Sequence, residues 1–336
     1  ARRGTVMLRM DPFRIEHPTT PDEAVALLAR HGAAAKICAG GTDVVPNLKH
    51  GLHEPEVLVH LGRVRALRGI EETADEVSIG AMTSLHEICS SELVATFAPG
   101  LVAAASHVAG PQLRRMGTLG GNLCLDTRCL YYNQTHFWRE ALGFCLKKDG
   151  TACHVVQGGQ KCVAAASNDT ATMLLCLDAV VDLAGPSGTR SLPLIDFYVA
   201  EGRKNTVLEG GEILVRCRLP KRAPMGRRLE GFAKLRHRES IDYPLLSVGV
   251  RFDVDDERTV RNARVTVNAI AARPRDVPVD VIVGKRLDDE AIEALALIAQ
   301  KKVNPLTNIC DDPRWRKDMV PVYVMRAAQM ALAGLG

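Results

Sequence analysis

The sequence has few aromatic residues and no long apolar run, and both shortages limit what the protein can be. Aromatic residues make up 4% of the 336 residues, so the core must be built mainly from Ala, Val, Leu and Ile. No apolar run reaches the ~20 residues of a membrane-spanning helix, so no membrane role is expected. Residues 1–4 contain two arginines, but no apolar stretch follows them, and we expect a cytoplasmic protein without a twin-arginine signal.

The charge of the chain is also modest. The net charge is +4, and the basic residues are scattered along the sequence rather than gathered in a stripe. Nucleic-acid binding is therefore not expected. The hydrophobic fraction of 46% and charged fraction of 24% are ordinary for a globular protein. A chain of this length exceeds one compact core, so we predict two or three packed units.

Short strands and helices alternate along the sequence, which predicts a mixed fold. Thr20 caps a helix that starts at Pro21 and ends before Gly32. Further helices are predicted at 101–108, 171–178, 288–301 and 314–334. Strands are predicted at 13–17, 36–39, 57–61, 77–82, 180–183, 212–218, 229–236, 244–254 and 260–270.

The first predicted β-α-β unit ends in a glycine-containing turn. The turn contains, in order, Ala39, Gly40, Gly41, Thr42 and Asp43. Adjacent glycines permit a tight turn with positive φ, and consecutive free N–H groups form a concave nest for a phosphate. Neither a G-x-G-x-x-G nor a Walker A pattern is present, so a nicotinamide Rossmann site is not indicated. Alone, this turn is better explained by a purely structural role.

A second turn of the same kind lies about eighty residues later. It runs from Thr118 through Leu119 and Gly120 to Gly121 and Asn122, and offers a hydroxyl, two glycines and an amide. Two such turns in one chain favour the two halves of a pyrophosphate clamp, and therefore a dinucleotide.

The order and distance of the two turns resemble the FAD-binding medium subunits of the xanthine dehydrogenase family of molybdenum hydroxylases. Asp169, just before a predicted helix, and Lys234, in a predicted strand, fit the same pattern. The resemblance implies an α+β fold with a two-part FAD-binding domain of vanillyl-alcohol-oxidase (PCMH) type at 8–222, split near residue 62. A C-terminal α/β domain of CO-dehydrogenase-flavoprotein type would follow at 223–336.

The resemblance also implies the cofactor contacts. The implied FAD-binding residues are Ala39, Gly40, Gly41, Thr42, Asp43, Thr118, Gly121, Asn122, Asp169 and Lys234. Asp169 and Lys234 also have plain alternatives, a helix cap and a surface charge. No residue of this chain is expected to act on the organic substrate.

Cysteine is concentrated in one tract of irregular pattern, at about 125–163. Five of the ten cysteines lie between Cys124 and Cys162. From Cys129 the steps are 16 residues to Cys145, eight to Cys153 and nine to Cys162. Four thiolates suit Zn²⁺ or an iron–sulfur cluster, and the steps match neither a zinc ribbon nor a bacterial ferredoxin. By spacing alone, some of these cysteines could equally be buried core thiols.

The tract resembles an insertion found in flavin subunits of the 4-hydroxybenzoyl-CoA reductase type. The similarity starts at Asn122, continues through Arg128 and Cys129, and includes Tyr132, Asn133 and Gln134. It implies a [4Fe–4S] cluster held by Cys129, Cys145, Cys153 and Cys162. Cys124 belongs to the glycine turn instead, and His154 is not needed as a ligand. Position 125 is Leu, whereas the resemblance predicts a polar residue near the flavin at this position.

The function implied by this resemblance is an electron relay. Electrons would pass between an external carrier such as a ferredoxin, the [4Fe–4S] cluster and FAD. They would continue to [2Fe–2S] clusters on a small partner subunit and a molybdenum cofactor on a large one, in a dimer of heterotrimers. The complex would remove the phenolic hydroxyl of an aromatic acyl-CoA, or, as an alternative, hydroxylate a heterocycle, aldehyde or steroid.

Two other classes of protein stay open at this point. One is a stand-alone FAD oxidase with a structural zinc in the cysteine tract. The other is a non-catalytic scaffold or zinc-binding interaction module. Flavin absorbance, bound metal and activity without partners distinguish these possibilities from the relay.

Overall fold

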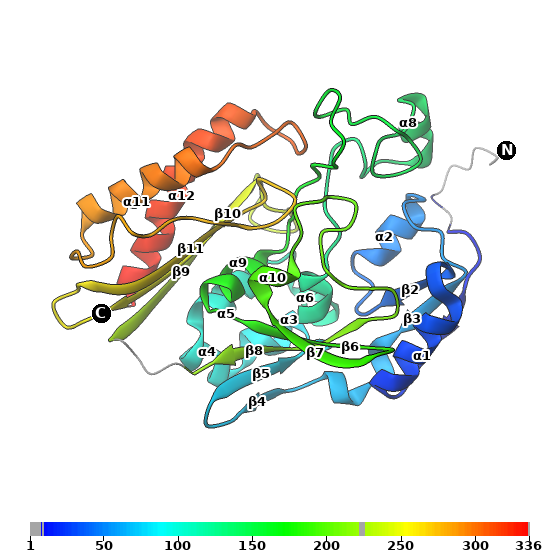
Figure 1. Ribbon diagram of the computed structural model, residues 1–336, viewed down its shortest axis with the longest axis horizontal. Coiled ribbons are helices and arrows are strands. Elements are labelled where there is room, and N and C mark those ends of the chain that lie inside the picture. The colour runs from blue at the N-terminus through cyan, green and yellow to red at the C-terminus, as the bar shows by residue number, and fades with distance from the viewer. Residues whose placement is uncertain (1–7, 9, 222–225, 335–336) are drawn as a thin grey trace.

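A computed structural model describes residues 8, 10–221 and 226–334, which form three β-sheets with flanking helices (Figure 1). The N-terminal sheet is parallel, in the order β1-β3-β2. Its strands are β1 (Arg14–Glu16), β2 (Ala35–Cys38) and β3 (Val57–His60). Helix α1 (Pro21–His31) connects the first two strands, and the hydroxyl of Thr20 accepts from the Glu23 amide at its start.

The second sheet is antiparallel and has the order β4-β5-β8-β6-β7. Its strands are β4 (Ile70–Glu72), β5 (Glu76–Gly80), β6 (Val180–Gly185), β7 (Gly188–Pro193) and β8 (Ile213–Pro220). Apolar side chains of this sheet share one core with the neighbouring helices. Those helices carry the second glycine turn, so the sheet provides a rigid base for it.

Short helices fill the chain between these strands. They are α2 (Val44–Lys49), α3 (Leu85–Ser90), α4 (Glu92–Phe97), α5 (Pro99–Ser106), α6 (Pro111–Met116), α7 (Leu119–Leu123), α8 (His136–Ala141), α9 (Asp169–Cys176) and α10 (Leu194–Phe197). Every residue of α9 is buried. This helix lies where the second and third sheets meet.

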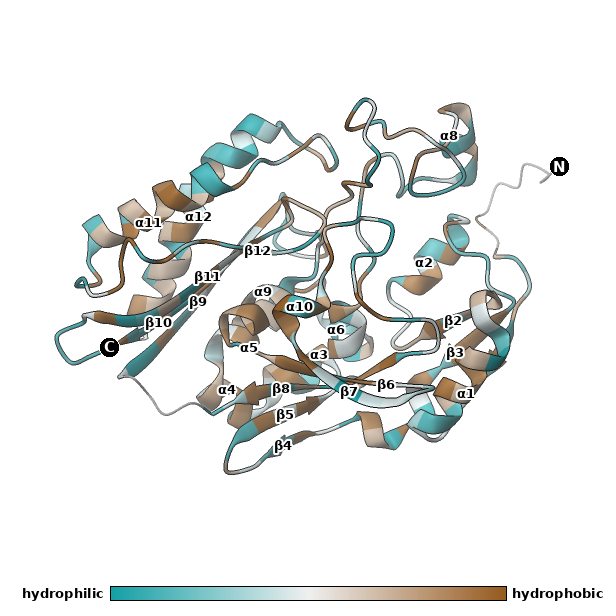
Figure 2. Cartoon of the chain, viewed as in Figure 1, coloured by the Kyte–Doolittle hydropathy of each residue, from teal (hydrophilic) through white to brown (hydrophobic). Residues whose placement is uncertain are grey.

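The C-terminal sheet is antiparallel, in the order β12-β11-β10-β9. It contains β9 (Arg227–Leu235), β10 (Leu246–Val254), β11 (Val260–Asn268) and β12 (Arg275–Asp276), and is followed by α11 (Asp289–Lys302) and α12 (Pro313–Ala333). A side chain at Gly231 would clash with the backbone of α12, and one at Gly249 with α9. The sheet is therefore enclosed between α12 and α9, and both α11 and α12 carry hydrophilic and hydrophobic residues in turn (Figure 2).

The cysteine tract lies apart from the sheets, at the upper right of Figure 1, near α2. Within 125–163 the only α-helix is the short α8. The prediction of an irregular insertion is thus largely confirmed. Local turns, such as the hydrogen bond from the Leu146 amide to the Ala152 carbonyl at 2.7 Å, and side-chain contacts hold its shape.

The α+β prediction is confirmed, and the predicted longer helices and strands are present within a few residues of their expected ends. The prediction missed most of the five- and six-residue helices, since so few residues carry little periodicity. No helix in the described part of the chain is long and apolar enough to cross a membrane. Residues 1–4 and the predicted domain boundary at 222/223 lie outside the described residues, and the division into domains stays a prediction.

Candidate cofactor site

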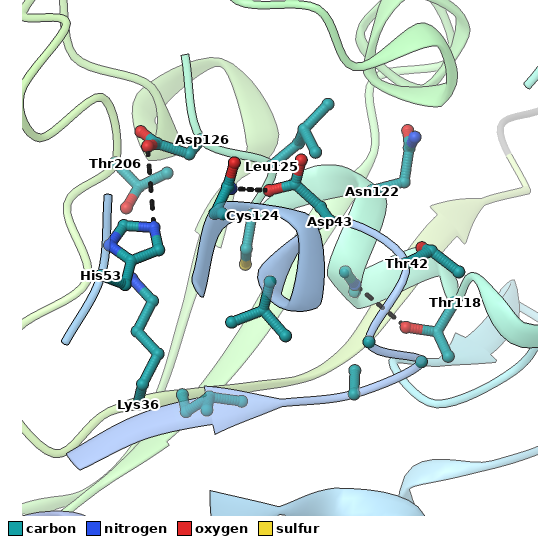
Figure 3. A pocket seen from close by; sticks show the side chains of 18 of the residues that line it. Lys36, Thr42, Asp43, His53, Thr118, Asn122, Cys124, Leu125, Asp126 and Thr206 are labelled. Carbon is teal, nitrogen blue, oxygen red and sulfur yellow. Dashed lines mark hydrogen bonds and ion pairs between the residues drawn. The ribbon is translucent and has the colours of Figure 1, made fainter. Parts of the chain in front are cut away.

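The two glycine turns meet at the wall of one large cavity of about 1230 Å³ (Figure 3). Nine of the ten predicted FAD-binding residues line it: Ala39, Gly40, Gly41, Thr42, Asp43, Thr118, Gly121, Asn122 and Asp169. The tenth, Lys234, lies behind Asp169. The cavity is larger than typical drug-sized pockets, as an extended dinucleotide requires.

The first turn follows β2 and needs glycine at two positions. A Cβ atom on Gly40 would lie 1.7 Å from the carbonyl oxygen of Met116. Gly41 has a φ of 75°, a conformation that side chains disfavour. In the described structure, the amides of Gly41 and Thr42 donate to no recorded acceptor. They are therefore free to bind an anionic group in the cavity.

The second turn faces the first. Thr118 caps α7, and its hydroxyl accepts from the Gly121 amide at 3.1 Å. A Cβ on Gly121 would lie 3.9 Å from the Cβ of Ala39, and one on Gly117 would lie 3.6 Å from the Thr42 hydroxyl. The fold thus joins two turns that are about eighty residues apart in sequence.

Asn122 connects the second turn to helix α9. Its side-chain oxygen accepts from the hydroxyl of Thr170 at 2.5 Å and from the Thr170 amide at 3.2 Å. The residue is 8% exposed and lines the cavity. Its role is therefore partly structural, because it fixes the turn against a fully buried helix.

Asp43 lies at the other end of the first turn and receives three hydrogen bonds. Asn47 donates to it at 2.8 Å, Tyr243 at 3.2 Å and Arg128 at 3.3 Å. Burial raises the pKa of Asp43, and the Arg128 guanidinium opposes this effect. The Arg128 guanidinium also lies 3.8 Å from the centre of the Tyr243 ring. Asp43 thus joins the first turn, the cysteine tract and the segment between β9 and β10.

Asp169 and Lys234 form an ion pair that is almost completely buried. The Lys234 ammonium donates to one Asp169 oxygen at 2.6 Å and to the His107 carbonyl at 3.0 Å. Their side chains are 4% and 1% exposed, which excludes a surface charge. Burial raises the pKa of Asp169, against the effect of Lys234. The other Asp169 oxygen is buried and has no partner, so a donor on a ligand would satisfy it.

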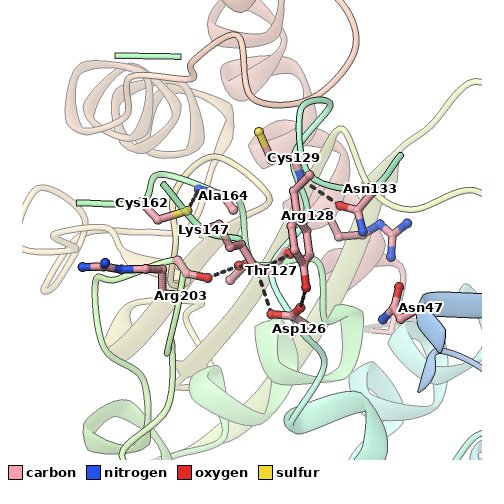
Figure 4. Close-up of polar contacts among 12 residues, drawn as sticks. Asn47, Asp126, Thr127, Arg128, Cys129, Asn133, Lys147, Cys162, Ala164 and Arg203 are labelled. Atoms are coloured by element: carbon pink, nitrogen blue, oxygen red, sulfur yellow. Dashed lines mark hydrogen bonds and ion pairs between the residues drawn. The ribbon is translucent and has the colours of Figure 1, made fainter. Parts of the chain in front are cut away.

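The four cysteines of the predicted cluster site converge on a second, small cavity. It is lined by Cys129, Cys145, Cys153 and Cys162 together with residues that include Tyr131 and His154. Amides donate to two of the thiols, from Val156 to Cys153 and from Ala164 to Cys162, the latter drawn in Figure 4. Cys124, which the sequence assigned to the second glycine turn, lines the large cavity instead.

The spacing of these four thiols does not fit a single tetrahedral ion. Sulfurs around Zn²⁺ lie roughly 3.8 Å apart, given Zn–S bonds of about 2.3 Å. Within the described ranges, only His237, Cys310 and Asp311 form a group of three such ligand atoms within 4.8 Å of one another. No three of the four thiols therefore lie within 4.8 Å of one another. Burial raises the pKa of Cys129 to about 11, so forming its thiolate requires a compensating cation.

Several residues of the large cavity were not expected from the sequence. They include Lys36, His53, Asp126, Arg128, Lys147, Thr206 and Tyr243. Burial lowers the pKa of His53 to about 4, so it is neutral near pH 7 beside Asp126 (Figure 3). Leu125, noted for its apolar character, also lines the cavity. Among these residues, only Arg128 and Asp126 could have been suspected from the sequence, because they lie close to Cys129. Tyr243 could not, because it is 200 residues from its partner Asp43.

Known families match both halves of the chain. Residues 11–222 match the FAD binding domain in molybdopterin dehydrogenase, and residues 231–331 match the CO dehydrogenase flavoprotein C-terminal domain. The carbon monoxide dehydrogenase medium chain of Hydrogenophaga pseudoflava is 30% identical over 330 residues, which cover 96% of this chain and 99% of that one. The aldehyde oxidoreductase FAD-binding subunit PaoB of Escherichia coli K12 is 33% identical, covering 79% and 83%.

A solved structure extends the similarity to three dimensions. A chain of carbon monoxide dehydrogenase from Hydrogenophaga pseudoflava superposes with a TM-score of 0.79 at 27% identity. The superposition covers 97% of this chain and 99% of that one. The predicted fold class, a PCMH-type domain followed by a CO-dehydrogenase-flavoprotein domain, is confirmed.

Proposed function

The chain belongs to the family of FAD-binding subunits of molybdopterin dehydrogenases, and from this we propose that it carries both FAD and a [4Fe–4S] cluster. Its role is electron transfer inside an oxidoreductase complex whose substrate chemistry takes place on a partner subunit. The proposal of a cluster beside FAD rests on the arrangement of the two sites. The four-cysteine cavity and the large cavity share residues in a common wall.

The large cavity fits FAD at several points. The amides of Gly41 and Thr42 suit the diphosphate, and so does the second turn, which faces them. The unpartnered oxygen of Asp169 suits a hydrogen-bond donor of the cofactor, while Lys234 holds the carboxylate in place. Asn122 and Thr118 keep the second turn rigid. All ten residues implied by the family resemblance thus have a position consistent with this role.

The cysteine site fits a cluster better than an ion. Its four thiols line one cavity, and no three of them lie within 4.8 Å of one another, whereas sulfurs around tetrahedral Zn²⁺ are roughly 3.8 Å apart. A cube of four irons and four sulfides is larger and takes one thiolate at each iron. The amides of Val156 and Ala164 donate to thiols, as is common around iron–sulfur clusters. We therefore assign Cys129, Cys145, Cys153 and Cys162 as its ligands.

When bound, FAD supplies one- and two-electron chemistry and the cluster supplies one-electron chemistry. The chain's own contribution is to fix both cofactors and exclude water from the space between them. We propose that its partners are a small [2Fe–2S] subunit and a large molybdenum-cofactor subunit, assembled as a dimer of heterotrimers. An external carrier such as a ferredoxin would exchange electrons at the cysteine site.

For the reaction of the complex we propose reductive dehydroxylation of an aromatic acyl-CoA, because the cysteine tract resembles that of the 4-hydroxybenzoyl-CoA reductase type. The alternative is hydroxylation of another substrate, such as an aldehyde. It is favoured by the 33% identity to the FAD-binding subunit of an aldehyde oxidoreductase. Assays of the purified complex with an aromatic acyl-CoA and with aldehydes distinguish the two.

Metal and flavin analysis of the anaerobically isolated subunit tests the cofactor assignment. We expect about four irons and four sulfides per FAD. The Cys153→Ser variant should lose iron and sulfide but keep FAD, whereas Cys310→Ser, at an exposed cysteine outside the site, should keep all three. About one zinc in place of iron would instead support a structural ion. FAD without any metal would rule out a cluster on this chain.

A further inference from the structure

The wall between the two cavities contains a charged residue that no other part of the site explains. Tyr132 and Lys147 line both the large cavity and the four-cysteine cavity. The Lys147 side chain is only 5% exposed. A buried ammonium is costly unless it is paired and hydrogen-bonded, so its position needs a reason.

Three contacts hold the Lys147 ammonium in place (Figure 4). It donates to a carboxylate oxygen of Asp126 at 2.7 Å, to the Thr127 carbonyl at 2.8 Å and to the Thr127 hydroxyl at 2.5 Å. An ammonium has three donors, so these bonds satisfy it completely. The charge is therefore fixed in one position and has no donor left for a ligand.

Tyr132 completes the wall. Its hydroxyl donates to the second carboxylate oxygen of Asp126 at 2.9 Å, and its ring centre lies 4.2 Å from the Lys147 ammonium. The ring thus adds a cation–π contact to the ion pair. Tyr132 is 3% exposed and the Lys147 side chain 5%, so these two residues are shielded from bulk water, whereas the Asp126 side chain is 24% exposed.

The network is attached to the backbone segments that carry the cysteines. Thr127 is two residues before Cys129, and Lys147 is two residues after Cys145. The Thr127 hydroxyl donates to the Gly202 carbonyl at 2.5 Å, and the Gly202 amide donates to the Cys162 carbonyl at 2.8 Å. The position of Lys147 is therefore coupled to three of the four proposed ligands.

The ion pair has a direction. Asp126 lines the large cavity but not the cysteine cavity, whereas Lys147 lines both. The carboxylate of the pair thus lies on the FAD side only, whereas Lys147 forms part of the wall of both sites. In a low-dielectric wall such a fixed pair acts on both sites with little screening.

We propose that Lys147 is a positioning residue that sets the difference in reduction potential between the two cofactors. This inference rests on the function proposed above. Reduction adds negative charge to a centre, so the nearby ammonium raises the reduction potential at the cysteine site. The carboxylate of Asp126 opposes reduction on the FAD side. The pair thereby favours electrons on the cluster over electrons on the flavin.

Redox titration of the whole complex, followed by EPR for the cluster and by absorbance for the flavin, tests this inference. Lys147→Met removes the charge, and we expect the equilibrium constant for cluster reduction to fall at least tenfold, about 59 mV for one electron. Lys147→Arg keeps the charge and should stay near wild type. Lys161→Met removes an exposed lysine next to Cys162 and should have little effect, because water screens it.

A second variant separates an electrostatic role from a purely structural one. Asp126→Asn leaves the ammonium unneutralised, so the cluster potential should rise, opposite to the shift in Lys147→Met. Shifts of the same sign in both variants, or none in either, would overturn the inference. Iron, sulfide and FAD are measured first in every sample. A wild-type complex without iron on this chain would refute the proposed function itself. If Lys147→Met loses its cluster but Asp126→Asn keeps it, the sign of the potential shift in Asp126→Asn tests the inference.

Discussion

At the scale of single residues, Gly40 shows how closely the two turns are packed. Any side chain there would overlap the Met116 carbonyl oxygen at 1.7 Å. Because that oxygen belongs to the backbone, rotation of a side chain cannot relieve the overlap. The glycine is therefore required by the contact between the turns as much as by a cofactor.

Replacing Gly40 by alanine should separate the turns and weaken FAD binding. We expect at least a tenfold loss of affinity, about 1.4 kcal/mol, measured by flavin fluorescence during titration of the apoprotein. Gly210→Ala is the matched control, since Gly210 lines the same cavity and has open space at its Cβ position. Equal affinities of the two variants would contradict this account.

At the scale of elements, Glu230 connects strand β9 with helix α5. Its side chain is 1% exposed, and one carboxylate oxygen accepts from the Gly100 amide at 2.9 Å. The other oxygen is buried without a hydrogen bond. Burial raises the pKa of Glu230 to about 7, so the folded protein holds a proton that the unfolded chain releases at a lower pH.

This raised pKa makes stability depend on pH. Between pH 4.5 and about 7 the folded state binds more protons at Glu230, so its contribution to the free energy of unfolding falls as pH rises. Glu230→Gln should remove this loss of stability and raise the free energy of unfolding at pH 8 by up to about 3 kcal/mol. Denaturant unfolding at pH 5 and pH 8 measures the free energy of unfolding, and the exposed Glu257→Gln is the control. A variant no more stable than wild type at pH 8 would argue against the raised pKa.

At the scale of the whole molecule, the cavity is assembled from segments far apart in the sequence. Arg128 of the cysteine tract lies between Asp43 of the first turn and the ring of Tyr243, which precedes β10. These three side chains hold the tract against both halves of the protein. We therefore expect them to control how readily a bound flavin leaves the cavity.

Two substitutions at Tyr243 test this expectation. Tyr243→Ala removes both the ring over Arg128 and the hydrogen bond to Asp43, and should speed FAD release several-fold. Tyr243→Phe keeps the ring and should stay within about twofold of wild type, since an exposed hydrogen bond contributes only about 1 kcal/mol or less. Stopped-flow release of flavin measures both. Equal rates in the two variants would mean that the ring has no part in retention.

Local sequence determined much of this protein. The longer helices and strands follow from periodicity and caps, such as Thr20 before α1. The tight glycine turns were predictable because few other residues adopt such backbone conformations. Four thiols gathered in one tract were compatible with a metal site, because thiolates are soft ligands, but their steps alone left buried core thiols as an alternative. The FAD contacts and the cluster were implied by family resemblance and stay predictions.

Only the tertiary structure decided how these parts meet. It placed the two turns in contact, paired Asp169 with Lys234 in the interior, and gathered the four thiols around one small cavity. It also buried Lys147 between the two cavities and paired it with the partly exposed Asp126. The reason is physical: burial and pairing of charges depend on packing between segments up to 200 residues apart, and local sequence does not encode those distances.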